Sequence, residues 1–419
     1  MDKILIRGNN SLRGSVQIRG SKNAVLPLMA GALLTEETCT LHNVPCLHDV
    51  FTMDKILTQM GVEIEFTGRF MTIRTPSNIV PYAPYDLVRK MRASFFVLGP
   101  LLARFGKAKV SLPGGCAIGT RPVDIHLKGL EKLGAKIHLE NGYVIAQGKL
   151  RGAEIYLDFP SVGATENLIM ASTLAEGVTK IYNPAQEPEV VDLANFLNKI
   201  GAKIRGAGTE VITIEGVKQL GGCEHTVIPD RIEAGTFIIA GIATNGDVQV
   251  NSVIPEHLAT FLTKLSEAGA EIEIGKNYIR AKSPNRILKS ISITTLPYPG
   301  FPTDLQAQTM ALLTCAEGTS IIKETIFENR FLHAAELCRM GADIKLEGNT
   351  AIIKGVECLK GAPVMASDLR ASAALIIAGL MAKEGETIIS RVYHLDRGYE
   401  RIEERLASLG ATIQRIRED

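Results

Sequence analysis

Hydrophobic and polar positions follow one pattern six times along the chain. In the first copy, residues 53–60 place apolar side chains at helical spacing before Gly61, and residues 62–66 alternate between apolar and polar. The glycine stands where a left-handed residue ends a helix. The equivalent glycines are Gly61, Gly134, Gly201, Gly269, Gly341 and Gly410. The sequence therefore predicts six repeated α/β units of about 70 residues each.

Each unit also carries a second predicted helix, rich in alanine and apolar on all sides, which indicates a buried central position. These helices are predicted over residues 24–34, 93–105, 164–175, 234–243, 305–316 and 371–382. Linear solenoids use shorter repeats, of about 20–50 residues. Grouping the repeats three and three predicts two α/β domains with a seam in residues 218–225, and a cleft between two lobes is a usual ligand site.

Polar turns precede the alanine-rich helices at equivalent places, and three of them carry a cation: Lys22, Arg92 and Arg370. A cation near the positive end of a helix is unfavourable by about 0.3–1 kcal/mol, whereas an anionic ligand there is stabilised. One such side chain alone would be read as reaching toward solvent or a surface carboxylate. Three at equivalent positions favour an anion site. At Asp304 the same helix dipole favours the ionised carboxylate that a general base needs.

A glycine-rich loop over residues 111–124 interrupts the repeats. It places Cys116 between glycines and five residues before Arg121, whose charge would stabilise a thiolate. Cys116 is therefore a candidate nucleophile or proton donor. The loop matches neither a P-loop nor a dinucleotide fingerprint, and no His/Asp set at protease spacing accompanies it. Cys315 and Cys338 fall within helical patterns and are predicted to pack in the core.

Composition narrows the class of protein. The formal net charge is +1, aromatic residues make up 5%, and tryptophan is absent, which disfavours nucleic-acid binding and attraction to acidic membranes. The seven cysteines form no C-x-x-C pair, which disfavours structural zinc and a disulfide framework. With neither a signal peptide nor a stretch long enough to span a bilayer, we expect a soluble, cytoplasmic α/β protein without membrane insertion. The sequence identifies no protein partner.

Three stretches carry a resemblance to a known family. They are Gly20-Ser21-Lys22-Asn23, residues 111–124 with Leu-Pro-Gly-Gly-Cys and Gly-x-Arg-Pro-Val-Asp, and residues 302–304 with 396–399. In them the chain resembles the enolpyruvyl transferases, and among these the UDP-N-acetylglucosamine 1-carboxyvinyltransferases, over essentially its full length. The resemblance implies two inside-out α/β barrel domains, each of three βαβαββ repeats. It implies domains of residues 21–229 and of residues 1–20 with 230–419, and an active site in the cleft between them.

The resemblance also implies the reaction: transfer of the enolpyruvyl group of phosphoenolpyruvate to the 3′-hydroxyl of UDP-N-acetylglucosamine, with release of phosphate and no cofactor or metal. Cys116 is then the acid that protonates the methylene carbon and the residue that forms a covalent adduct. Asp304 is the base near the sugar hydroxyl. The implied phosphoenolpyruvate-binding residues are Lys22, Asn23, Arg121, Arg330, Arg370 and Arg397.

For the nucleotide sugar, the resemblance implies contacts from both halves of the chain. These residues are Asn23, Arg92, Arg121, Pro122, Val123, Asp124, Ile125, Ser161, Val162, Gly163, Asp304 and Ile326. The sequence departs from the pattern at one place, since Phe159-Pro160 precede Ser161 where some members have a lysine that helps to bind the diphosphate.

Two other functions compete with this interpretation. The related enolpyruvyl transferase that acts on shikimate 3-phosphate shares the sixfold fold, but it lacks the cysteine loop and the uridine-binding stretch, so residues 111–125 argue against it. A non-catalytic sixfold scaffold would give no reason for Cys116 beside Arg121, or for Asp304 at a helix start.

Overall fold

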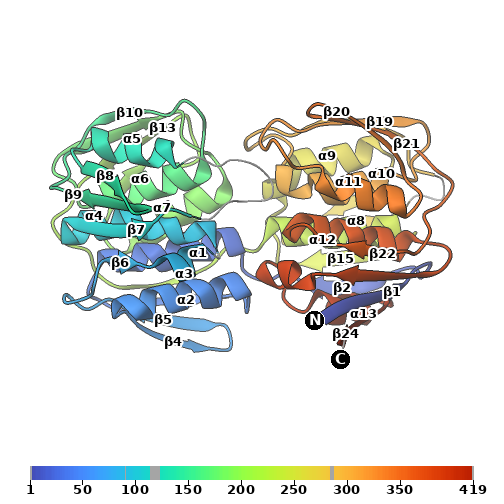
Figure 1. Ribbon diagram of the computed structural model, residues 1–419, viewed down its shortest axis with the longest axis horizontal. Coiled ribbons are helices and arrows are strands. Elements are labelled where there is room, and N and C mark those ends of the chain that lie inside the picture. The colour runs from blue at the N-terminus through green and yellow to red at the C-terminus, as the bar shows by residue number, and fades with distance from the viewer. Residues whose placement is uncertain (1, 90, 114–122, 284–286, 418–419) are drawn as a thin grey trace. The chain divides into compact units, whose positions relative to one another are not determined.

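The computed structural model describes residues 2–89, 91–113, 123–283 and 287–417 of the 419-residue chain. These residues divide into two compact units (Figure 1). The N-terminal unit comprises residues 20–113 and 123–228, and the C-terminal unit comprises residues 2–19 and 229–417. The chain passes from one to the other at Arg19–Gly20 and at Ile228–Pro229.

The described strands form six four-stranded sheets with one shared plan. In the N-terminal unit the sheet orders are β14-β3-β5-β4, β6-β7-β9-β8 and β10-β11-β13-β12. In the C-terminal unit they are β16-β17-β15-β2, β18-β19-β21-β20 and β22-β23-β1-β24. Each sheet contains one parallel pair, and its other pairs are antiparallel. The six predicted repeats are thus six copies of one supersecondary unit.

The strands are short, and most alternate between buried and exposed residues, as expected for sheets with one face on a core. Those of the N-terminal unit are β3 (Cys39–His42), β4 (Glu63–Thr67), β5 (Phe70–Arg74), β6 (Tyr82–Ala83), β7 (Lys107–Ser111), β8 (Lys136–Glu140), β9 (Tyr143–Gln147), β10 (Glu154–Tyr156), β11 (Val178–Tyr182), β12 (Lys203–Arg205), β13 (Val211–Glu215) and β14 (Cys223–Thr226). Those of the C-terminal unit are β1 (Asp2–Arg7), β2 (Arg13–Gln17), β15 (Asp247–Asn251), β16 (Glu271–Ile274), β17 (Tyr278–Lys282), β18 (Ser292–Thr294), β19 (Thr319–Lys323), β20 (Asp343–Glu347), β21 (Thr350–Lys354), β22 (Pro363–Met365), β23 (Glu386–Ser390) and β24 (Thr412–Arg417).

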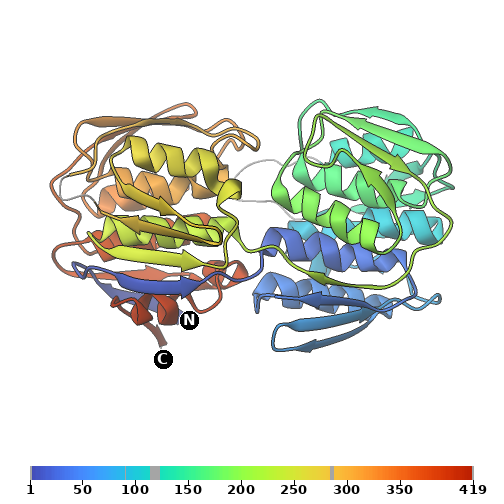
Figure 2. The ribbon, with the colours of Figure 1, turned by 180° about the vertical axis from the view of Figure 1, so that it is seen from behind.

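Helices lie inside each unit, with the sheets around them (Figures 1 and 2). The N-terminal unit contains α1 (Lys22–Gly31), η1 (Ala32–Leu34), α2 (His48–Met60), α3 (Tyr85–Val88), η2 (Arg92–Val97), α4 (Leu98–Phe105), α5 (Asp124–Lys132), α6 (Val162–Ser172) and α7 (Pro188–Lys199). The C-terminal unit contains α8 (Arg231–Ala243), η3 (Pro255–Leu258), α9 (Ala259–Glu267), η4 (Thr303–Leu305), α10 (Gln306–Leu313), α11 (Leu332–Arg339), α12 (Leu369–Met381), η5 (Val392–Arg397) and α13 (Ile402–Ser408). Each unit has its own hydrophobic core.

The alanine-rich helices are central, as the sequence predicts. In the C-terminal unit α8, α10 and α12 pack against one another, and every residue of α10 is buried. Small side chains let these helices approach closely, whereas the surrounding helices, such as α2, bury only one face. The six predicted glycines all adopt positive φ angles, between 96° and 107°, which confirms their place at helix ends.

The N-terminal strands belong to the C-terminal unit. Strand β1 lies between β23 and β24 and is antiparallel to both, with Ile4 opposite Ile389 and Arg415. Strand β2 is parallel to β15. The chain therefore begins and ends in one sheet.

Residues 218–225, where the repeats alone predict a seam, do not separate the units. They contain the start of β14, which pairs with β3 inside the N-terminal unit. Cys338 is a second correction, because it lies in α11 as predicted but is exposed, on the side of that helix away from the core.

Candidate active site

Asp304 lies at the centre of a charged cluster in the C-terminal unit. Its Oδ1 accepts a hydrogen bond from Nη2 of Arg330 at 2.8 Å, and its Oδ2 accepts one from Nη2 of Arg370, also at 2.8 Å. The side chains of the two arginines are 4% and 6% exposed, and that of Asp304 is 26% exposed. Asp304 thus contacts both arginines directly, and all three residues are among those predicted from the sequence.

The local fold explains why these side chains converge. Asp304 lies in the short η4 turn that leads into α10, and Arg370 lies in the first turn of α12, which packs against α10. Asp368 caps α12 by accepting hydrogen bonds from the backbone N–H groups of Arg370 and Ala371. Arg330 lies in the turn before α11, and α11 also contacts α12.

A buried polar network supports Arg370 from the other side. Its Nη1 donates a hydrogen bond to Oη of Tyr399 at 3.2 Å. The same Oη lies 2.8 Å from Oγ1 of Thr236 and accepts from Nε2 of Gln308 at 3.3 Å. Burial acts to lower the pKa of Arg370, but Asp304 and Tyr399 outweigh it and raise that pKa above its ordinary value. The guanidinium therefore stays charged and is fixed in direction.

Sequence reasoning missed most of this network. Thr236 and Gln308 lie within helices that read as apolar, so no pattern marks them. Tyr399 lies within a segment dense in charge and at the end of residues 396–399, which carry part of the family resemblance, but neither signal indicates a contact with Arg370.

Two histidines near the cluster have lowered pKa values. Burial, reinforced by Arg330, lowers the pKa of His333 to about 4, although Asp368 opposes the shift. Burial followed by Arg397, at the end of η5, lowers the pKa of His394. Both histidines are therefore neutral near pH 7, and the carboxylates that act on the two arginines are those of Asp304, Asp368 and Asp230. The two buried guanidiniums are the groups of this cluster that could bind an anionic ligand.

The predicted cations of the N-terminal unit also lie at helix starts. Lys22 is the first residue of α1, and its Nζ lies 3.5 Å from Oδ2 of Asp49. The side chains are 14% and 4% exposed, so the lysine contacts a buried carboxylate rather than bulk solvent. Asn23 follows in the same helical turn.

A second set of predicted residues surrounds His126 in α5. Burial, followed by the charge of Arg92, lowers the pKa of His126 to about 3, with Asp124 opposing the shift. Gly163 approaches the ring so closely that a β-carbon there would lie 3.4 Å from Cε1. Ser161 caps α6 by accepting a hydrogen bond from the N–H of Ala164 at 3.4 Å. The turns near residues 92, 124 and 163 therefore meet at a histidine that the sequence did not single out.

The remaining predicted residues fall into two groups. The first group lies within the described residues. Val123 and Ile125 flank Asp124 at the start of α5, and Val162 is the first residue of α6. In the C-terminal unit, the N–H of Ile326 donates to Oε1 of Glu324 at 2.8 Å. Cys116, Arg121 and Pro122 lie outside the described residues.

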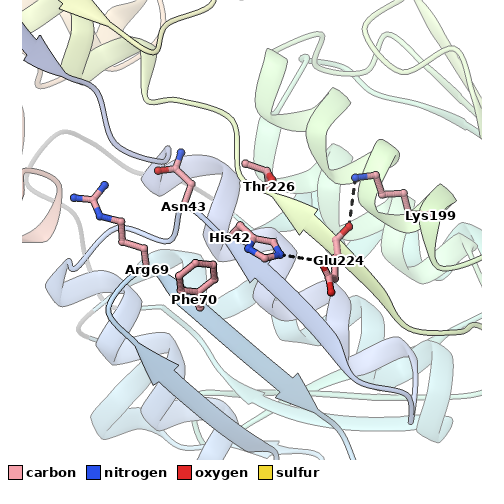
Figure 3. Close-up of a pocket in the computed structure, with 7 residues that line it drawn as sticks. All are labelled: His42, Asn43, Arg69, Phe70, Lys199, Glu224 and Thr226. Carbon is pink, nitrogen blue, oxygen red and sulfur yellow. Dashed lines mark hydrogen bonds and ion pairs between the residues drawn. The ribbon is translucent and has the colours of Figure 1, made fainter.

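A surface hollow of about 590 Å³ contains none of the predicted residues. It lies against β3, β5 and β14 in the N-terminal unit, where His42 contacts Glu224 and Lys199 reaches the backbone of Glu224 (Figure 3). Its other lining residues are Asn43, Arg69, Phe70 and Thr226. The chemistry indicated by the sequence therefore lies elsewhere.

No group of three or more His, Cys, Asp or Glu side chains within the described ranges is arranged to hold a metal ion. In the part of the chain that the structure covers, no helix has the length and hydropathy to cross a bilayer.

Comparison with known proteins identifies the family. A family model described as EPSP synthase (3-phosphoshikimate 1-carboxyvinyltransferase) matches residues 6–406. A curated relative from Magnetococcus marinus, named UDP-N-acetylglucosamine 1-carboxyvinyltransferase, is 58% identical over 418 residues, which span 99% of this chain and 100% of the relative. The chain belongs to the UDP-N-acetylglucosamine 1-carboxyvinyltransferase family. A relative from Carboxydothermus hydrogenoformans, named UDP-N-acetylglucosamine 1-carboxyvinyltransferase 2, is 57% identical over 99% of this chain and 100% of its own length.

Solved structures confirm the fold expected of this carboxyvinyltransferase family. The enolpyruvyl transferase NikO from Streptomyces tendae has a TM-score of 0.90 at 25% identity, over 99% of this chain and 98% of its own. An EPSP synthase from Acinetobacter baumannii has a TM-score of 0.76 at 20% identity over the full length of both chains, a likeness that concerns the fold alone. The chain is therefore a transferase with the repeated two-domain architecture that the sequence predicts.

Proposed function

We propose that the chain transfers the enolpyruvyl group of phosphoenolpyruvate to the 3′-hydroxyl of UDP-N-acetylglucosamine and releases phosphate. The observation that carries the proposal is the Asp304 carboxylate held between Arg330 and Arg370, two buried guanidiniums, in a chain that is 58% identical to a relative of that name. Phosphoenolpyruvate carries a carboxylate and a phosphate, and arginine pairs with both groups through two parallel hydrogen bonds.

Asp304 suits the role of general base at the sugar hydroxyl. Its two oxygens accept hydrogen bonds from the two arginines, which fix the direction of the carboxylate. The side chain is partly exposed, which leaves it open to a substrate. A positioned base of this kind contributes about 10²–10⁴-fold to the rate.

The proposed chemistry is an addition followed by an elimination. Cys116 gives a proton to the methylene carbon of phosphoenolpyruvate, the 3′-oxygen adds to the neighbouring carbon, and Asp304 takes the hydroxyl proton. The Cys116 thiolate then takes a proton back from the methyl group as phosphate departs, and the double bond is restored. Cys116 also forms the covalent adduct with phosphoenolpyruvate that the family resemblance implies. The proposed phosphate-side cations are Lys22, Arg121 and Arg397.

The proposed nucleotide-sugar contacts centre on the turns around His126. Arg92 and the start of α6 at Ser161 would face the diphosphate, because a cation and free helix N–H groups both favour an anion. Residues 121–125 would hold the uracil, and Asn23, Asp304 and Ile326 the sugar. The proposal thus draws on residues of both units. It also assigns the chain to the start of peptidoglycan synthesis in the cytoplasm.

Phosphate release tests the proposal directly. The chain should release phosphate from phosphoenolpyruvate when UDP-N-acetylglucosamine is present, and mass spectrometry should find the enolpyruvyl ether of that sugar nucleotide. Shikimate 3-phosphate in its place should give no release. Phosphate release with shikimate 3-phosphate, but not with UDP-N-acetylglucosamine, would overturn the proposal in favour of a 3-phosphoshikimate 1-carboxyvinyltransferase. If a chain that melts cooperatively releases phosphate with neither acceptor, the result would favour a non-catalytic scaffold.

A further inference from the structure

Two cysteines far apart in the sequence face each other across neighbouring strands. In the parallel pair of β3 with β14, Cys39 lies directly opposite Cys223. Paired residues project from the same face of a sheet, and adjacent strands lie about 4.7–4.9 Å apart. Disulfides join residues whose Cα atoms are about 4.4–6.8 Å apart. The backbone therefore holds the two side chains at a separation that a disulfide can bridge.

The two thiols have different environments. Cys39 is fully buried, whereas Cys223 lies on the edge strand of its sheet and is half-buried. The thiol of Cys39 donates a hydrogen bond to the sulfur of Cys223, which lowers the pKa of Cys223 and raises that of Cys39. Burial of Cys223 opposes this shift, and the charge of Lys199, beside the same strand (Figure 3), adds to it, so that the pKa of Cys223 lies below its ordinary value. Cys223 is thus the thiol that ionises and meets solvent, and Cys39 is its protonated neighbour.

We propose that Cys39 and Cys223 form a peroxide-sensitive pair that closes a reversible disulfide between β3 and β14. In the first step the Cys223 thiolate attacks one oxygen of hydrogen peroxide, and the O–O bond breaks. Cys223 becomes a sulfenic acid, and the hydroxide released takes up a proton to form water. The sulfur of Cys39 then attacks the sulfur of the sulfenic acid, loses its proton and displaces the second hydroxide as water. One peroxide thus oxidises two thiols to one disulfide, with two waters formed, and a dithiol reductant reverses the reaction.

The other described cysteines supply internal comparisons. Cys46 and Cys338 are exposed and lie outside the strands, Cys46 in the loop before α2 and Cys338 in α11. Cys315 lies near Cys358, yet burial raises the pKa of Cys315, and its sulfur accepts a hydrogen bond from Thr314. Cys46 and Cys338 therefore show the effect of exposure alone, and Cys315 with Cys358 shows the effect of proximity alone.

The disulfide would secure the strand that leads out of the N-terminal unit. Directly after β14, the N–H of Val227 donates to the backbone oxygen of His42, and the Asn43 amide donates to the oxygen of Val227, both at 3.1 Å. Ile228 is the last residue of the unit. A link from residue 39 to residue 223 closes a loop that includes most of the N-terminal unit, and long closed loops restrict the unfolded chain strongly.

The test treats the full-length chain with hydrogen peroxide, blocks the remaining thiols with N-ethylmaleimide and maps the digest by mass spectrometry without reductant. We expect a peptide that joins Cys39 to Cys223, its loss after dithiothreitol, and a rise in melting temperature of about 5 °C or more on oxidation. Cys338→Ser, the control variant, should form the same cross-link. At the same dose Cys315 and Cys358 should stay unlinked.

Single variants separate the two roles. Cys39→Ser removes the resolving thiol, so Cys223 should persist as a sulfenic acid that dimedone labels. Cys223→Ser should leave Cys39 unlabelled. Dimedone on Cys39 in preference to Cys223 would overturn the proposal. So would a wild-type digest without the 39–223 cross-link in which the exposed Cys338 is oxidised, and this second readout needs no variant to fold.

Discussion

The substitution Asp304→Asn isolates the electrostatic work of one carboxylate. It keeps the shape of the side chain but removes the carboxylate that contacts both Arg330 and Arg370, whose side chains are 4% and 6% exposed. Removing one member of a buried ion pair costs about 3–5 kcal/mol because the remaining charge stays desolvated. Since Asp304 is itself 26% exposed, water can replace part of its effect, and we expect a loss of about 2–4 kcal/mol.

This loss converts into a large thermal shift. In a unit of about 200 residues, 1 kcal/mol corresponds to about 2–4 °C, so the transition of the C-terminal unit should fall by on the order of 10 °C. Differential scanning calorimetry of the full chain measures it. Added inorganic phosphate should restore part of the loss, because an anion can sit against the two guanidiniums. Turnover should fall by about 10²–10⁴-fold.

Asp247→Asn is the matched control in the same unit. Asp247 accepts two hydrogen bonds of 2.7 Å from Arg280, and its side chain is 29% exposed, close to the value for Asp304. Its arginine is 38% exposed, however, and exposed pairs contribute about 0–1 kcal/mol. We expect a shift of about 3 °C or less, with no response to phosphate. Equal shifts in the two variants would refute the reasoning, since they would show that the buried arginines do not depend on Asp304.

Three further predictions concern separate parts of the chain. Cys116→Ser should abolish turnover and labelling by the epoxide fosfomycin, while calorimetric titration still finds nucleotide-sugar binding; wild-type turnover would remove Cys116 from the chemistry. Tyr399→Phe takes from Arg370 the hydroxyl that its Nη1 contacts at 3.2 Å, so the KM for phosphoenolpyruvate should rise about 3–10-fold with kcat less affected, and an unchanged KM would exclude a positioning role. The pKa of His126 is about 3 in the folded chain, against an ordinary value of 6.5. Below pH 6.5 the unfolded state therefore binds a proton that the folded state does not bind. The free energy of unfolding should fall by up to about 1.4 kcal/mol per pH unit toward pH 4. His126→Gln should flatten this slope in denaturant titrations at pH 6.5 and 5, and an equally steep slope would count against the assignment.

The sixfold repeat could be predicted because short stretches of the sequence determine its elements. Helical spacing, the glycine that ends each helix and the alternating strand all act within about 20 residues, and the six glycines adopt the φ angles that this predicts. The seam was placed wrongly because strand pairing is not local. Strand β14 joins β3 from 184 residues away along the chain, and no feature of residues 218–225 encodes that partner.

The same contrast between local signals and long-range contacts applies to the residues of the candidate site. Charged residues at helix starts stand out because a cation there is locally unfavourable, so Lys22, Arg92 and Arg370 could be selected from the sequence. His126 and Tyr399 could not, because each owes its role to packing. A lone histidine in an amphipathic helix and a tyrosine beside charged residues look ordinary until the fold places Arg92 or Arg370 next to them.

The position of β1 in the middle of its sheet sets an order of assembly. The N-terminal unit is one continuous stretch after residue 19, so it can fold on the ribosome as soon as β14 has emerged. Residues 2–17 are synthesised before that unit but pair with strands that follow it: β2 with β15, and β1 with β23 and β24. Until β23 and β24 have been synthesised, both edges of β1 lack their partners. Unpaired strand edges favour aggregation, so β1 is exposed to this risk for longer than the strands of the N-terminal unit.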